Sequence, residues 1–154
     1  AGTVYSKESA DLLKSSHEAA YELIKKSRGK INSSQPIIAA SFSSINNLDK
    51  SSSFGRIASQ QFASAFTSSG YTVTELLLRD NIYIKQRQGE FLLSRSLKNI
   101  SDEHNAQAVI VGTYAEGRNK LFVTAKVVDT GNNTVISSYD YVLPIDPDLK
   151  ALLR

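Results

Sequence analysis

The last third of the chain contains three strand-like segments joined by two short turn sequences, and this pattern constrains the fold more than any other. The segments read QAVIVGTYA, KLFVTAKVVD and NTVISSYDYVL, and the linkers between them are EGRN and TGNN. Gly and Asn at such linker positions favour tight hairpin turns. We therefore expect an antiparallel β-meander that ends at Pro144 and Pro147, followed by a short tail that is compatible with a helix.

Upstream of the meander, helical and strand-like patterns alternate. An amphipathic helix is expected from about Ser6, its N-cap, to Arg28, with Gly29 as its stop. PIIAASF (36–42) reads as a strand that is apolar on both faces and hence interior to a sheet. SSINNLDKSSS reads as a polar loop. A helix capped by Ser52 or Ser53 then follows, with phenylalanines and alanines on one face.

The middle of the chain predicts two further extended pieces and one more helix. YTVTELLL (71–78) alternates as a strand does, and NIYIKQRQ reads as a short extended segment. A third helix is expected to open at Gly89-Glu90 and to end near His104. We expect His104 to be partly buried at the end of that helix.

These patterns define an α/β (α+β) fold. Strand–helix–strand connections imply parallel crossovers, whereas hairpins imply antiparallel pairs. We expect one domain over 1–154 with a single mixed sheet of about five strands, helix–βαβαβ followed by the β-meander, and helices packed on the sheet. Its parts are the N-terminal helix (1–30), the core (36–142) and the tail (143–154).

Composition narrows the functional classes. The 154 residues include no Cys and no Met, which excludes disulfides and thiolate metal sites, and the chain begins with Ala1, as in a processed or trimmed product. No apolar run approaches the ~18 residues that a membrane-spanning helix requires. The net charge of +3 is mild, and one face with clustered charge and stacking aromatics is lacking, so nucleic acid is not an expected partner.

Residues for catalysis, metal binding or cofactor binding are not evident. The two histidines, His17 and His104, lie far apart in the sequence, and adjacent Asp102 and Glu103 diverge on a helix. One weak candidate for an anion site is the helix start at Ser53, Gly55 and Arg56, where free backbone N–H groups can hold an anion. Helix capping and loop solubility explain the same serines.

The segment YIKQRQGEFLLSR (83–95) is a candidate for protein interaction. It is basic and alternating, which suits an extended edge, and it carries no chemistry of its own. We expect a surface used between copies or toward a neighbouring protein, formed by Tyr83, Lys85, Arg87 and Arg95. A solvated connector explains the same pattern.

Three stretches together resemble the FlgO family: SSSFGRIASQQFASAFTSSGYTV, YIKQRQGEFLLSRSLKNISDEHNAQAVIVGTYAEG and LFVTAKVVDTGNNTVISSYDY. The resemblance covers about residues 36–142 and leaves the N-terminal helix outside. The matching positions are Phe54-Gly55-Arg56, Gly70-Tyr71, Gly89 to Arg95, His104 to Tyr114, and Val128 to Gly131.

The resemblance implies a bacterial flagellum-associated lipoprotein of the outer membrane, with a fold similar to the N-terminal domain of TolB. It implies a non-enzymatic part of a ring or disc, homo-oligomeric assembly, flagellar basal-body or ring proteins as partners, and an N-terminal lipid anchor not present in this chain. Two alternatives stay open. One is a module that regulates an envelope enzyme or assembly machine, like penicillin-binding-protein activators or curli-secretion lipoproteins. The other is an enzyme or anion-binding domain.

Overall fold

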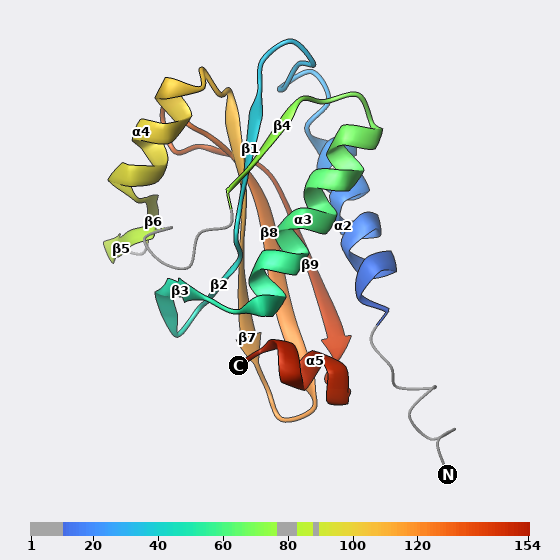
Figure 1. Ribbon diagram of the computed structural model, residues 1–154. Helices are drawn as coiled ribbons and strands as arrows, with labels where there is room; N and C mark the ends of the chain where they lie inside the picture. The colour runs from blue at the N-terminus through green and yellow to red at the C-terminus, as the bar shows by residue number, and fades with distance from the viewer. Residues whose placement is uncertain (1–10, 77–82, 88–89) are drawn as a thin grey trace.

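The computed structural model describes residues 11–76, 83–87 and 90–154 (Figure 1). The helices of this part are α2 (Leu12–Lys26), α3 (Ser53–Ser68), α4 (Arg95–Glu103) and α5 (Pro147–Leu152). The strands are β1 (Ile37–Ala40), β2 (Ser43–Ser44), β3 (Asn47–Ser51), β4 (Val73–Leu76), β5 (Tyr83–Arg87), β6 (Glu90–Leu93), β7 (Ala108–Glu116), β8 (Lys120–Asp129) and β9 (Val135–Pro144).

A mixed sheet of seven strands is built around β7. On one side of β7, β1 pairs in parallel and β4 pairs in parallel with β1. On the other side, β8 and β9 continue as the antiparallel meander that the turn sequences predict. Farther along β7, the short β2 pairs in parallel and carries β3 at its side. The expected mixed α/β fold is therefore confirmed.

Helices cover both faces of the sheet. α2 and α3 lie on one face and α4 on the other, while α5 packs at the end where the β7–β8 hairpin turns (Figure 1). The α2–α3 side holds the larger core, and its fully buried side chains include Leu23, Ile37, Phe54, Phe62 and Phe66. The α4 side holds a smaller core, which comprises Ile38, Ala40, Leu93, Leu97, Val109, Val111 and Val128.

The predicted start of the third helix is wrong. Glu90–Leu93 forms β6, which pairs antiparallel with β5 in a separate two-stranded ribbon. The helix begins only at Arg95, because the Ser94 side chain caps it by accepting from the Leu97 N–H at 3.1 Å. Glu90 therefore does not lie at the positive end of a helix. Gly89 lies outside the described residues.

Three smaller expectations also change. The predicted polar loop after β1 forms β2 and β3, which raises the strand number above the expected five. His104 is exposed rather than partly buried, because it is the C-cap of α4 and the chain turns away at Asn105, whose φ is +53°. The first described helix begins at Leu12 with Asp11 as its N-cap, and the predicted cap Ser6 lies outside the described residues.

The C-terminal end of α2 is fastened to β9. The Ser27 and Ser137 hydroxyls share a buried hydrogen bond of 2.7 Å. Next to it, Lys26 Nζ donates to the Ser138 carbonyl at 3.2 Å and lies 5.2 Å from the centre of the Tyr139 ring. A lysine side chain that lies along an outer strand discourages unspecific pairing of that strand with other chains. α2 thus both covers the sheet and shields part of its outer edge.

Tyr141 on β9 places a hydroxyl in the α2–α3 core. Its ring stacks on Phe62 with a centroid distance of 6.4 Å. Burial raises the pKa of Tyr141 far above its ordinary value of 10, and nearby Ser16 opposes the shift. Within the described chain neither hydroxyl has a well-formed hydrogen bond. Burial therefore disfavours ionisation of Tyr141 in the folded core.

Tyr141 makes the fold sensitive to alkali. An unfolded tyrosine loses its proton near pH 10 while buried Tyr141 retains it, so the free energy of unfolding falls as pH rises above 10. The fall is up to about 1.4 kcal/mol per pH unit for this one group. In Tyr141→Phe we expect a shallower decline, measured by urea unfolding from pH 9 upward. Tyr21→Phe, which removes an exposed tyrosine hydroxyl, is the matched control, and a Tyr141→Phe curve parallel to that of the wild type would contradict the prediction.

Candidate functional site

Four of the residues that carry the family resemblance meet at one junction, where the start of α3 packs against β7. Phe54 and Gly55 come from the first turn of α3, and Gly112 and Tyr114 come from β7. Phe42, which follows β1, lies between the two groups. The Phe42 ring also contacts Phe62 farther along α3, with a centroid distance of 5.1 Å. We refer to these five residues, Phe42, Phe54, Gly55, Gly112 and Tyr114, as the α3–β7 junction.

Gly55 is required where α3 touches the backbone after β1. The Phe42 N–H donates to the Gly55 carbonyl at 3.0 Å, and the Ser51 hydroxyl donates to the Phe42 carbonyl at 2.5 Å. A Cβ atom on Gly55 would overlap both the Phe42 carbonyl oxygen and Ser51 Oγ. Only glycine allows the helix to approach this closely.

Gly112 allows a similarly close contact between β7 and the Phe42 ring. A Cβ atom on Gly112 would overlap the Phe42 ring, which lies directly on the β7 backbone. The ring is fully buried in this position. Phe42 is therefore held between two glycines, one in α3 and one in β7.

Tyr114 completes the junction with a polar contact. Its ring meets Phe54 edge to face at a centroid distance of 5.0 Å, and its hydroxyl shares a 2.7 Å hydrogen bond with Ser52 Oγ. Burial raises the pKa of Tyr114, and the Ser52 hydrogen bond opposes the shift. Ser52 is also the N-cap of α3, because its Oγ accepts from the Gly55 N–H at 3.3 Å. One serine thus links the helix start to β7.

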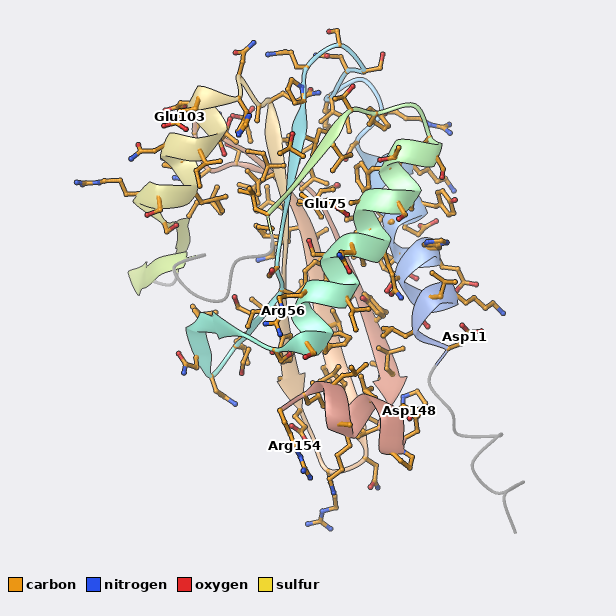
Figure 2. The ribbon with its side chains drawn as sticks, in the orientation of Figure 1. Asp11, Arg56, Glu75, Glu103, Asp148 and Arg154 are labelled. Atoms are coloured by element: carbon orange, nitrogen blue, oxygen red, sulfur yellow. The ribbon has the colours of Figure 1, made fainter. Side chains whose placement is uncertain are left out.

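The three residues of the candidate anion site lie together in the first turn of α3. Arg56 Nη2 donates to Ser53 Oγ at 3.3 Å, and both residues are half-buried (Figure 2). The Arg56 backbone N–H donates to the Ser52 carbonyl as a regular helix bond. The capping alternative thus accounts for these contacts. Anion binding at Ser53, Gly55 and Arg56 stays a prediction.

The candidate interaction segment forms part of the β5–β6 ribbon. Tyr83, Lys85 and Arg87 lie on β5, whose extended backbone agrees with the expectation, but their side chains lie outside the described part. The register between β5 and β6 shifts by one residue between Tyr83 and Gln86. A shift of this kind interrupts the alternation, so the sequence pattern does not place the three on one face. Arg95 is the exposed first residue of α4, next to β6.

Elsewhere in the described chain, groups that could perform chemistry are scattered. No three His, Cys, Asp or Glu residues of this part gather as metal ligands would. Half-buried His17 contacts Tyr21 in α2, with a ring centroid distance of 6.2 Å, whereas His104 belongs to α4 on the opposite face. Among the described helices, none combines the length and apolar character needed to cross a membrane.

Sequence reasoning missed a groove between α3 and β4. It has a volume of about 410 Å³, and Glu75 contributes the single charged side chain of its described lining (Figure 2). The other lining residues are small or apolar: Ala63, Ser64, Thr67, Ser68 and Val73. The only sequence signal for this groove is the run of small residues on one side of α3. That side has no apolar periodicity, so it does not stand out in the sequence.

Comparison with solved structures defines the class of fold. The C-terminal domain of LpoB from Salmonella enterica has a TM-score of 0.54 at 15% sequence identity, and the match covers 83% of this chain and 97% of that domain. The NMR structure of Escherichia coli LpoB has a TM-score of 0.53 at 14% identity, with coverage of 84% and 68%. The chain therefore shares the α/β fold of these LpoB domains. Identities this low establish the fold alone.

Sequence comparison then gives the family. Residues 17–148 match the FlgO protein family, and the chain belongs to the FlgO family. The match extends beyond the 36–142 over which the resemblance was seen in the sequence, and it includes most of α2. Its attachment to β9 explains why α2 is part of the unit. Comparison with curated protein sequences finds no match.

Gly55→Ala tests whether the junction depends on close backbone approach. The new methyl group would collide with the Phe42 carbonyl, which cannot move without displacing β1, so we expect a loss of about 2–3 kcal/mol in the free energy of unfolding. Gly131→Ala is the matched control, because the new Cβ meets only Asp129 Oδ1, at 3.2 Å. Urea unfolding measures both variants. Equal stability of the two variants would refute the role assigned to Gly55.

Proposed function

We propose that this protein is a non-enzymatic structural component of a flagellum-associated ring or disc at the outer membrane, needed for motility and acting by protein–protein assembly. The observation that carries the proposal is membership of the FlgO family over residues 17–148. Export and attachment through an N-terminal lipid anchor outside this sequence belong to the same proposal. Flagellar basal-body or ring proteins are the proposed partners.

The organisation of the α3–β7 junction supports a structural role rather than a catalytic one. The residues of the family pattern that meet there are engaged in close packing and in helix capping, and their polar groups contact one another. A catalytic pattern would instead place its polar groups around a space where a substrate can sit. The pattern therefore specifies how α3 is mounted on the sheet, which leaves the outer surface for contacts with partners.

The second candidate is a lipoprotein module of the outer membrane that regulates a cell-envelope enzyme, as a penicillin-binding-protein activator does. The fold shared with LpoB domains favours this candidate. It requires the same location and the same absence of catalysis. The two candidates differ in the partner and therefore in the phenotype that follows from loss of the protein.

Electron cryotomography of flagellar basal bodies in a strain that lacks this gene separates the candidates. We expect loss of a ring or disc at the outer membrane together with impaired swimming, both restored by the wild-type gene. Intact basal bodies with normal swimming would refute the flagellar proposal. Altered rates of cell-wall synthesis in the same strain would then favour the regulatory candidate.

The β5–β6 ribbon is the proposed contact with a neighbouring protein of the ring. Reversing charge by Lys85→Glu together with Arg87→Glu is expected to weaken incorporation into the basal body without lowering the melting temperature, because the proposed role of both charges is in contact with the neighbour and not in folding. Lys14→Glu, at an exposed position on α2, is the control. Normal incorporation of the double variant would show that this segment is only a solvated connector.

A further inference from the structure

The two outer strands of the main sheet run in the same direction. β4 is parallel to β1 and β1 to β7, while β8 and then β9 each reverse direction, so β9 is again parallel to β7 and β4. In the described part of the chain, no strand pairs with the outer edge of β4 or of β9. A second copy in the same orientation can therefore bring its β9 beside β4 as a parallel pair.

Opposite charges lie at the same level of these two edges. The pairing registers connect one residue from each strand into a single row across the sheet: Glu75, Ala39, Ile110, Val127 and Ser137. Glu75 is exposed at the β4 end of this row. At the β9 end, Lys26 Nζ is bound to the carbonyl of Ser138, the residue after Ser137.

We propose that copies of this chain assemble head to tail, with the β4 edge of one copy against the β9 edge of the next and Glu75 paired with Lys26 of that neighbour. The proposal deepens the assembly role proposed above and rests on it. Exposed opposite charges orient partners and select between pairings more than they add affinity. Here they select the heterologous contact, because the alternative two-fold contacts bring Lys26 toward Lys26 or Glu75 toward Glu75.

The helix layer is complementary in the same arrangement. α3 packs against β4, but a groove stays open between them, lined by Ala63, Thr67 and Glu75 among others. Glu75 is exposed in this groove. Since α2 packs over β9, a neighbour whose β9 joins β4 brings its own α2 to this groove. Sheet and helix layer then both continue into the next copy.

Lys26 has two roles in this proposal. In the single chain it hinders pairing at the β9 edge, because its Nζ donates to the Ser138 carbonyl and lies over the Tyr139 ring. On assembly it releases that carbonyl to the β4 backbone and turns to Glu75 of the neighbour. An exposed hydrogen bond of this kind is weak, so the exchange costs little. The residue that prevents unspecific edge pairing thus becomes the one that specifies the correct pair.

A charge swap tests the proposal on the purified full chain. Glu75→Lys and Lys26→Glu are each expected to weaken self-association at least about tenfold, and the double variant to regain it within a few-fold. Sedimentation velocity over a range of concentrations gives the association constants. Glu103→Lys and Lys150→Glu are the matched controls, because they make the same charge changes at exposed positions outside the proposed contact, at the end of α4 and on α5. Figure 2 shows Glu103 on the opposite face of the sheet from α2 and α3. A wild-type chain that stays monomeric, or a double variant no better than the single ones, overturns the proposal.

Cysteine cross-linking tests the geometry directly, since these 154 residues include no cysteine. With Glu75→Cys and Lys26→Cys in the same chain, a short bifunctional maleimide should produce a ladder of multimers, whereas each single variant should stay uncross-linked. A dimer from either single variant would reveal a two-fold contact and overturn the proposal. Both tests use purified protein, so they are independent of the deletion phenotype. If the chain assembles head to tail but basal bodies are intact in the deletion strain, only the flagellar role is refuted. If the disc is missing in that strain but the purified chain is monomeric, only the proposed interface is refuted.

Discussion

The contact on which the rest of the structure depends is the placement of Phe42 between Gly55 and Gly112. The Phe42 ring lies on the β7 backbone while its carbonyl meets the first turn of α3. This contact fixes both the distance and the level at which α3 crosses the sheet. α2 packs on α3 and on β9 in turn, so the larger core is assembled outward from this point. A side chain at either glycine would overlap Phe42 and push these elements apart.

Features with a local physical cause could be predicted from the sequence. The meander follows from Gly and Asn at its turns, and the start of α3 follows from a serine cap before an apolar stripe. Both are decided by neighbours in the chain. The mixed α/β fold then follows from the order of the elements. Ser53, Gly55 and Arg56 lie in the first turn of α3, and anion binding there stays a prediction.

Features decided by distant residues could not be predicted. EFLL (90–93) pairs with β5 rather than starting a helix, and only the ribbon partner distinguishes a strand from a helix start there. The polar segment after β1 becomes β2 because β7 offers its edge, although the segment has no apolar alternation. The part played by Phe42 is the clearest case. Nothing beside it in the sequence indicates that glycines far along the chain leave room for its ring and carbonyl.

The α3–β7 junction and the two edges of the main sheet are structurally related. An open sheet always has two edges, and an unshielded edge invites uncontrolled association. Here Lys26 shields β9, whereas the β4 side keeps a groove with one carboxylate, Glu75. The α3–β7 junction lies between these edges. By packing α3 onto the sheet, it helps to keep β4 and β9 at a fixed distance and in a fixed register relative to each other. A rigid spacer with opposite charges at its two ends is a unit that can be repeated, and the packing at Phe42 provides the rigidity on which such repetition depends.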